Sequence, residues 1–297
     1  MSLLGFSRFA AVVFLASSAA SFAAAEDVKV ADDLTMHYRV AGSGDQVILL
    51  VPGLTASGEV FERQLAHFQN STDYTVYAID PRGQGQSSKT ATGNTYEQHG
   101  RDVAAFMQAL SLKDVVLAGW SNGAFDVMAY VDQNTADNLR GLILIDGTPK
   151  CSGADNATEW VWYRRDDSDG YKQYYTQGFL HDRQNLNTAF ATWMVENPTA
   201  EYLSWIDGII SQTPDEVAAL LNETSAYLDY SEDLRGLEGK LPLLYVARTE
   251  WAPLVSGWAQ ANTPSATVEA LGKHMMFWEK SEDFNAILDK YLVTVKN

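Results

Sequence analysis

The sequence has a single cysteine, few basic residues and no histidines at a metal-binding spacing. Because Cys151 stands alone, an intramolecular disulfide and a metal site built from cysteine thiolates are excluded. The five histidines show no H-x-x-x-H or H-E-x-x-H spacing, so the motif of a zinc hydrolase is absent. Lysine and arginine number 21 against 38 aspartates and glutamates, which gives a formal charge of −17. Such a field repels phosphate backbones and anionic lipids, so nucleic-acid binding is disfavoured.

Long apolar runs are also missing beyond the N-terminus, so we expect no stable membrane anchor in the mature protein. The first residues differ from the rest. Arg8 precedes a short apolar run over residues 9–20, and residues 23–25 (A-A-A) match the small-x-small pattern of a cleavage site. A retained anchor and a frayed apolar terminus are the alternatives. We predict that residues 1–25 are a signal peptide and that the protein is exported, either periplasmic or secreted.

The remaining sequence alternates between strand-like and helix-like segments, in a chain with globular composition (46% hydrophobic, 20% charged). Continuous apolar runs predict strands covered on both faces, and helical spacing predicts amphipathic helices between them. Two short strands at 29–32 and 36–40 come first, followed by strands at 46–51, 74–79, 115–118 and 142–145 and, later in the chain, at 241–247 and 266–271. The helices between the middle strands are at 57–68, 96–110 and 125–131. This alternation predicts an α/β fold with a mostly parallel central sheet flanked by helices.

The alternation stops after Asp146 and resumes near residue 241. Residues 148–235 contain no comparable buried strand but hold four of the eight tryptophans and seven of the fourteen tyrosines. Helix-start signals stand at Asn197-Pro198 and in the T-P-D-E segment over residues 213–216. We therefore predict one α/β core, formed by residues 26–147 and 236–297, and a helical cap inserted between them over residues 148–235.

Two residues are candidates for nucleophilic catalysis. Ser121 lies in G-W-S-N-G over residues 119–123, directly after a buried strand and at the start of a helix. In that context G-x-S-x-G predicts a sharp turn that exposes the serine. A serine hydroxyl needs a base, and His274 follows the strand at 266–271, at the sheet edge where α/β proteins place catalytic groups. The other four histidines lie in predicted strands, helices or the cap.

Taken together, these pieces resemble an α/β-hydrolase of the alpha/beta-hydrolase-1 type, with a helical cap inserted after the sixth strand. The resemblance covers nearly all of the predicted mature chain. Residues 51–54 (V-P-G-L) stand where the family has its oxyanion turn, with Pro52 in place of the usual histidine. Residues 80–87 (D-P-R-G-Q-G-Q-S) match the family's D-x-R-G-x-G-x-S loop, in which Asp80 and Arg82 are expected to be structural supports. The resemblance implies neither a metal nor an organic cofactor.

The resemblance also implies roles for particular residues. Ser121 would be the nucleophile and His274 the base, and the backbone N–H groups of Leu54 and Asn122 would form the oxyanion hole.

The third member of the triad is ambiguous. Glu250 stands after the seventh strand, where the family commonly has an aspartate, and the order Ser121, Glu250, His274 fits the hydrolase triad. Asp146, at the end of the sixth strand, is the alternative. We predict Glu250.

We therefore expect a carboxylesterase-like serine hydrolase acting on a small, apolar ester in a pocket under the cap, lined by Trp120 and Trp251. Lactonase, C–C hydrolase, aminopeptidase and perhydrolase activities use the same triad. The serine argues against haloalkane dehalogenases and epoxide hydrolases, which resemble the family branch with a nucleophilic aspartate. A second class is a non-catalytic ligand-binding protein of the same fold. The sequence does not indicate an oligomeric state.

Overall fold

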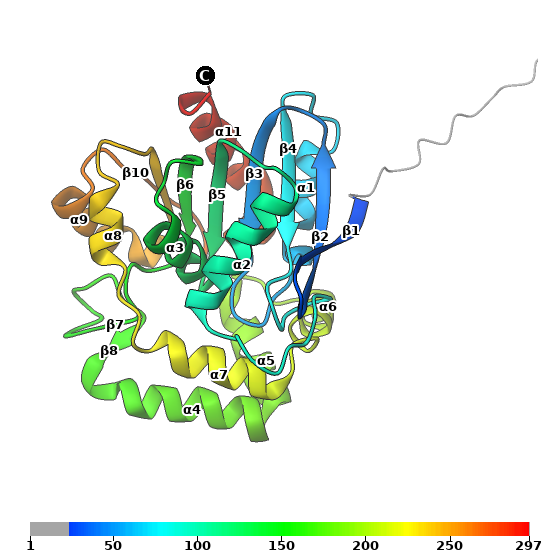
Figure 1. The fold of residues 1–297 in the computed structure, drawn as a ribbon. Coiled ribbons are helices and arrows are strands. Elements are labelled where there is room, and N and C mark those ends of the chain that lie inside the picture. Colours follow the sequence, from blue (N-terminus) through cyan, green and yellow to red (C-terminus); the bar gives the residue numbers. More distant parts are fainter. Residues whose placement is uncertain (1–23, 297) are drawn as a thin grey trace, which may run out of the picture.

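An eight-stranded sheet forms the centre of residues 24–296, the part of the chain that the computed structural model describes (Figure 1). The strand order is β1-β2-β4-β3-β5-β6-β9-β10, and β2 runs in the direction opposite to the other seven strands of this sheet. The strands are β1 (Ala24–Ala31), β2 (Leu34–Gly42), β3 (Gln46–Val51), β4 (Tyr74–Ile79), β5 (Val115–Trp120), β6 (Leu139–Ile145), β9 (Leu243–Ala247) and β10 (Thr267–Ala270). The predicted, mostly parallel sheet is confirmed.

Burial on both faces explains why the central strands are continuously apolar. In β3, Ile48 and Leu50 point into one hydrophobic core, whereas Leu49 and Val51 point into the other. Side chains alternate between the faces of a strand, so a strand buried on both sides needs apolar residues at every position. The same alternation holds in β5 and β6.

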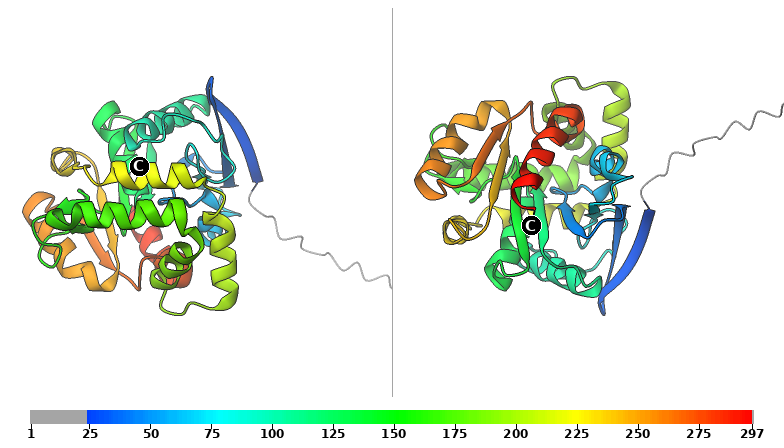
Figure 2. Two further views of the ribbon diagram at one scale, coloured as in Figure 1. Left: turned by 90° about the horizontal axis from the view of Figure 1, so that it is seen from below. Right: turned by 90° about the horizontal axis from the view of Figure 1, so that it is seen from above.

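Helices cover both faces of the sheet (Figure 2). On one side α2 (Tyr96–Ala109) packs against α3 (Gly123–Asn134), and α8 (Ser231–Gly236) packs against α3. On the other side lie η1 (Gly58–Phe61), α1 (Glu62–Phe68), α10 (Met276–Glu279) and α11 (Ser281–Thr294). Helix α9 (Ala252–Asn262) follows the short turn η3 (Thr249–Trp251) and packs on β9 and β10.

A helical insertion separates β6 from β9 in the chain, as predicted. Its helices lie together beyond the end of the sheet, at the bottom of Figure 1, and α4 and α7 run side by side (Figure 2, left). The helices are α4 (Ser168–His181), α5 (Arg183–Met194), α6 (Ala200–Ile210) and α7 (Asp215–Ser225), preceded by the paired short strands β7 (Ser152–Gly153) and β8 (Tyr163–Arg164) and the turn η2 (Arg165–Asp167). The cap was predicted to run to residue 235, but α8 packs on the core helix α3, so from here on the cap means residues 148–230.

The two helix-start signals in the cap were wrong in detail. Helix α6 begins at Ala200, where the Thr199 side chain accepts a hydrogen bond from the Tyr202 N–H (3.2 Å), so Asn197 is not its N-cap. Helix α7 begins at Asp215 without a side-chain cap. The Thr213 hydroxyl instead donates to the Thr55 carbonyl in the core (2.9 Å), so tertiary contact replaces the expected local one.

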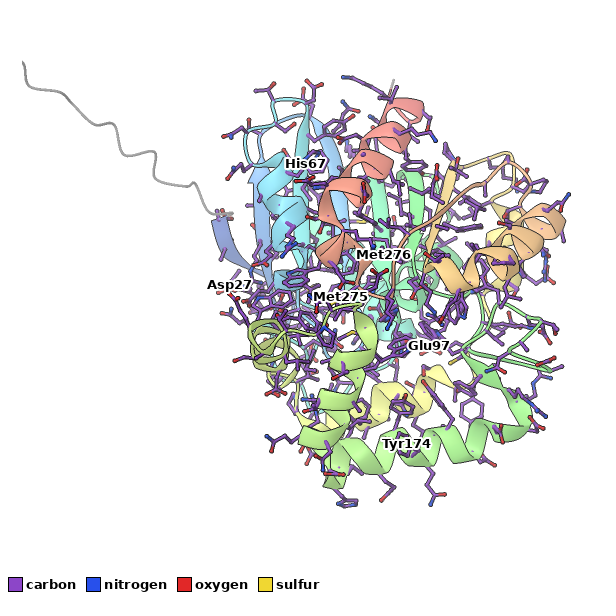
Figure 3. The ribbon with its side chains drawn as sticks, turned by 180° about the vertical axis from the view of Figure 1, so that it is seen from behind. Asp27, His67, Glu97, Tyr174, Met275 and Met276 are labelled. Atoms are coloured by element: carbon purple, nitrogen blue, oxygen red, sulfur yellow. The ribbon has the colours of Figure 1, made fainter. Side chains whose placement is uncertain are left out.

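Further contacts join the cap to the core near the end of α5. The Met275 N–H donates to the Met194 carbonyl (2.9 Å), and Met275 and Met276 both lie in the interior of the molecule (Figure 3). The predicted signal peptide lies outside the described residues, except for Ala24 and Ala25, which begin β1. Across residues 24–296, each helix is too short or too polar to cross a membrane.

Candidate active site

Ser121 occupies a strained turn between β5 and α3. Its φ of 57° lies in the left-handed region that L-residues rarely adopt. Two glycines make the turn possible. A Cβ on Gly119 would lie 2.3 Å from the Gly123 carbonyl oxygen, and a Cβ on Gly123 would lie 2.5 Å from the Pro52 carbonyl oxygen. Strand and helix therefore approach closely enough to present the serine hydroxyl, as the G-x-S-x-G pattern predicts.

His274 lies beside Ser121, as expected from its place after β10. Its Nε2 is 3.0 Å from the Ser121 Oγ. The ring is buried, with Trp120, Trp162 and Trp193 at centroid distances of 5.1, 5.5 and 4.9 Å. Burial lowers the pKa of His274 below its ordinary 6.5, although the hydrogen bond with Asp146 opposes the shift. The imidazole is therefore neutral at pH 7 and able to accept a proton.

Asp146 is the carboxylate that contacts His274. Its Oδ2 lies 2.6 Å from the His274 Nδ1. Burial would raise the pKa of Asp146, but the bond to His274 and the nearby guanidinium of Arg248 outweigh burial and lower that pKa below its ordinary value. Asp146 also has a left-handed backbone, with φ of 43°. An ionised carboxylate, an imidazole and a hydroxyl thus form one chain of hydrogen bonds.

The predicted contact of Glu250 with His274 is wrong. Glu250 lies in η3, beyond the end of β9, where its side chain is 69% exposed and bonds to Arg248 (2.7 Å). Asp146 follows β6 directly, and β6 is the neighbour of β9 in the sheet. Both residues therefore stand at the same sheet edge, but the 3-10 turn carries Glu250 outward to solvent.

The main chain around Leu54 is held by side chains from two other segments. The Gln84 Oε1 accepts from the Thr55 N–H (2.7 Å), and its Nε2 donates to the carbonyls of Gly53 and Ala56 (3.4 and 3.2 Å). The Thr213 hydroxyl of the cap donates to the Thr55 carbonyl. Within residues 24–296, no hydrogen-bond acceptor takes the N–H of Leu54 or that of Asn122. Both groups thus remain free to bind a ligand oxygen near Ser121.

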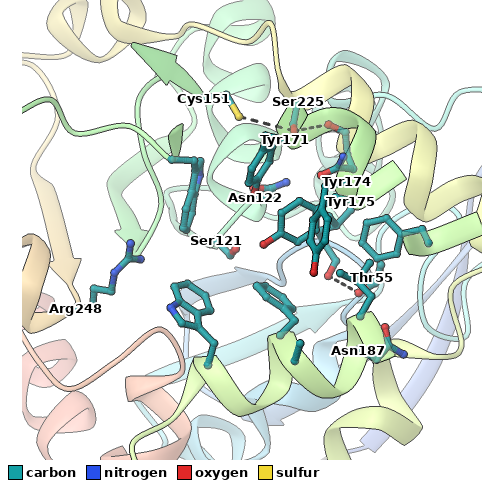
Figure 4. A pocket seen from close by; sticks show the side chains of 18 residues that line it. Thr55, Ser121, Asn122, Cys151, Tyr171, Tyr174, Tyr175, Asn187, Ser225 and Arg248 are labelled. Atoms are coloured by element: carbon teal, nitrogen blue, oxygen red, sulfur yellow. Dashed lines mark hydrogen bonds between the residues drawn. The ribbon is translucent and has the colours of Figure 1, made fainter. Parts of the chain in front are cut away.

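The site opens into a cavity of about 430 Å³ between the sheet and the cap. Figure 4 shows Ser121 among aromatic side chains, with Arg248 toward one end and Asn187 toward the other. The aromatic lining comes entirely from the cap: Trp162, Tyr171, Tyr174, Tyr175, Phe179, Phe190 and Trp193. Leu54, Thr55 and Asn122 contribute from the core. A cavity of this size and lining fits a small, largely apolar molecule.

Neither tryptophan predicted for the pocket lines it. Trp120 is buried beside His274, where its Nε1 donates to the His274 carbonyl (2.9 Å). Trp251 packs beneath Arg248 instead of facing the cavity. Their positions beside catalytic candidates in sequence were misleading, because neighbouring residues of a strand or turn point in different directions. The tryptophans that do line the cavity, Trp162 and Trp193, belong to the tryptophan-rich cap.

The described residues contain no group of three or more histidine, cysteine, aspartate or glutamate side chains that could hold a metal ion. Cys151 lines the cavity and is buried between the Tyr163 and Ser225 hydroxyls (3.4 and 3.8 Å). Burial raises the pKa of its thiol to about 11. At pH 7 this thiol is protonated and is a poor nucleophile.

Comparison with known proteins finds relatives by family model, by sequence and by structure. A family model described as alpha/beta hydrolase fold matches residues 46–281. The human serine hydrolase BPHL is 38% identical over 97 residues, which span 31% of this chain and 33% of that protein's length. A bromoperoxidase structure from Bacillus anthracis superposes with a TM-score of 0.80 at 19% identity, covering 91% of this chain and 99% of that one. An esterase from Exiguobacterium antarcticum gives 0.78 at 20% identity, with coverages of 91% and 99%.

Proposed function

This chain belongs to the alpha/beta hydrolase fold family, and from that premise we propose that it is an exported serine hydrolase that cleaves small carboxylic esters. The observation that carries the proposal is the hydrogen-bonded chain Ser121–His274–Asp146 at the floor of an aromatic cavity. The pKa values of His274 and Asp146 are both lowered, so at pH 7 the imidazole is neutral and the carboxylate is ionised, as a base and its acid partner require.

The reaction begins when the Ser121 Oγ attacks the ester carbonyl. His274 Nε2 takes the hydroxyl proton, and Asp146 stabilises the imidazolium through its bond to Nδ1. The free N–H groups of Leu54 and Asn122 bind the oxyanion of the tetrahedral intermediate. His274 then gives its proton to the leaving alcohol, which departs and leaves an acyl-enzyme. Water, activated by the same histidine, cleaves the acyl-enzyme and restores Ser121.

The cap supports an apolar ester as substrate, because its aromatic side chains cover the cavity above Ser121. Export is a separate part of the proposal and rests on the sequence of residues 1–25. Lactones, amides and peroxide could enter the same chemistry. A panel of p-nitrophenyl esters of increasing acyl length, with lactones and amino-acid amides beside it, distinguishes these substrates.

Ser121→Ala tests the proposal directly. We expect turnover to fall by several powers of ten without unfolding, since an alanine methyl fits the turn but cannot attack a carbonyl. A fluorophosphonate probe should label the wild type at Ser121 and leave this variant unlabelled. Ser231→Ala is the matched control, because Ser231 in α8 is equally buried (6%) but lies away from His274. Near-wild-type turnover by Ser121→Ala would reject the serine mechanism. An unlabelled wild type would favour a ligand-binding protein.

A further inference from the structure

Arg248, directly after β9, contacts Asp146 with both its main chain and its side chain. Its backbone N–H donates to the Asp146 Oδ1 (2.9 Å), and its Nη1 donates to the Oδ2 (2.8 Å). The Oδ2 is the same oxygen that bonds the His274 Nδ1. Two of the three donors to this carboxylate therefore come from Arg248. Together they fix the rotation of the Asp146 carboxylate about its Cβ–Cγ bond.

The guanidinium of Arg248 is itself held firmly. It lies over the ring of Trp251 at 3.2 Å and near the rings of Trp193 and Trp162 at 5.2 and 5.4 Å. Its Nε donates to Glu250 at the solvent edge (2.7 Å), and the residue is only 5% exposed. Trp162 and Trp193 belong to the cap and also pack against His274. The same two indoles thus contact the proposed base and the residue that holds its acid.

We propose that Arg248 is a positioning residue for the triad: it locks the Asp146 carboxylate toward His274 and supplies the positive charge that balances it in the interior. A buried carboxylate without such a partner is strongly destabilised. Among residues 24–296, Arg248 is the one lysine or arginine that forms an ion pair with Asp146, and the His274 imidazole beside it is neutral at pH 7. The inference rests on the proposed function, in which Asp146 acts through His274.

The charges around the triad set the expected pH behaviour. The charged groups that face His274 are Asp146, which raises its pKa, and Arg248, which lowers it. Those that face Arg248 are Asp146 and Glu250. Removing the guanidinium charge should therefore raise the pKa of His274 and move the acidic limb of activity to higher pH. A variant that only misplaces the Asp146 carboxylate would lower kcat without raising the pKa of His274.

Two variants separate charge from geometry. Arg248→Met keeps much of the apolar stem but removes the charge and the bond to Oδ2. Arg248→Lys keeps the charge but lacks the planar guanidinium, whose several N–H donors bond to Asp146 and Glu250 at once. We expect kcat to fall roughly 10- to 100-fold in both, the factor that a charge-assisted hydrogen bond contributes. Histidine NMR titration of the full chain should show His274 titrating at higher pH in Arg248→Met and near the wild-type pH in Arg248→Lys.

Arg39→Met is the matched control. Arg39 also bonds a fully buried aspartate, Asp80, and a more exposed glutamate, Glu59, but at a distance from the triad. It should lower stability and leave the titration of His274 unchanged. The inference is overturned if Arg248→Met titrates like the wild type, if both Arg248 variants shift equally, or if their only effect is a higher KM for anionic esters. The NMR titration needs no substrate, so it tests the role of Arg248 separately from the proposed function. Failure of the fluorophosphonate probe to label the wild type would instead reject the proposed function.

Discussion

At the scale of single residues, two members of the proposed triad have strained backbones. Ser121 and Asp146 are two of the six non-glycine residues with positive φ among those described. Each such residue costs on the order of 1–3 kcal/mol, so the surrounding structure must hold it in place. At Ser121 the close approach of β5 and α3 does this. At Asp146 the hydrogen bonds from Arg248 and His274 do so.

Asp146→Asn and Glu250→Gln form a pair that identifies the acid. The amide at Asp146 should favour the wrong imidazole tautomer and reduce kcat by up to about 10⁴-fold with the fold intact. Glu250→Gln should change kcat little, because the exposed carboxylate reaches only Arg248. Steady-state kinetics and thermal melts of both variants measure this. A larger loss in Glu250→Gln would restore the acid predicted from the sequence.

The protonation of His274 predicts how activity depends on pH. The base must be neutral, and burial lowers the pKa of His274 below 6.5, so neutrality extends to lower pH than for an exposed histidine. We expect kcat/KM to be constant near pH 7 and to fall only as pH drops below about 6.5, when the imidazole becomes protonated. A pH profile with a non-ionisable ester checks this. An acidic limb centred above pH 7 would contradict it.

The contact between Ser121 and His274 could be predicted, because each stands in a motif or shortly after a strand whose place in the sheet was clear. The carboxylate that contacts His274 could not be predicted, since both candidates follow neighbouring strands and only the turn after β9 decides which side chain faces inward. Arg248 carries no sequence signal for its role. Its contact with Asp146 depends on how β6 and β9 are aligned in space.

At the scale of elements, one glutamine makes most of the side-chain hydrogen bonds that hold the main chain over residues 53–56. Gln84 makes three bonds to its main chain. Gln84→Ala should free the Leu54 N–H to turn away from the oxyanion, and we expect kcat to fall by roughly 10²-fold, comparable to losing an oxyanion donor. KM should change less. Gln86→Ala is the control, because Gln86 stands two residues away with an exposed side chain. Equal kinetics in the two variants would reject this role.

The elements themselves followed the sequence closely where burial dictated the pattern. The predicted strands at 46–51 and 74–79 match β3 and β4 residue for residue. The helix expected over 57–68 is divided into η1 and α1, since local spacing does not distinguish a 3-10 turn from an α-helix. The starts of two cap helices were misplaced for different reasons: Thr199 caps α6 locally in place of Asn197, whereas Thr213 bonds to the core instead of capping α7.

At the scale of the whole molecule, the core and the cap supply different parts of the site. The core holds Ser121, Asp146 and His274 at the edge of the sheet, whereas the cap provides the aromatic cover. Cap residues that line only the cavity can therefore change substrate preference without moving the proposed triad, whereas Trp162 and Trp193 also pack against His274.

Processing at the N-terminus is the prediction at this scale. We expect the exported protein to begin at or within a few residues of Glu26. Cleavage there would remove Ala24 and Ala25 from β1 but keep the pairing from Glu26 onward, including the bond from the Tyr38 hydroxyl to Glu26 (2.6 Å). Intact-mass measurement of protein from the periplasm or medium checks this. Retention of residues 1–25 on the exported species would contradict it.

The adjacency of β6 and β9 governs when the site can assemble during folding. The two strands pair side by side, yet the entire cap lies between them in the chain, so their pairing closes a loop of about 100 residues. Closing such a loop costs little extra free energy but slows folding. Until β9 and β10 dock, β6 has an unpaired edge, and Asp146 lacks both Arg248 and His274. A chain emerging from the ribosome therefore cannot assemble the proposed Ser121–His274–Asp146 site until its last strands have paired.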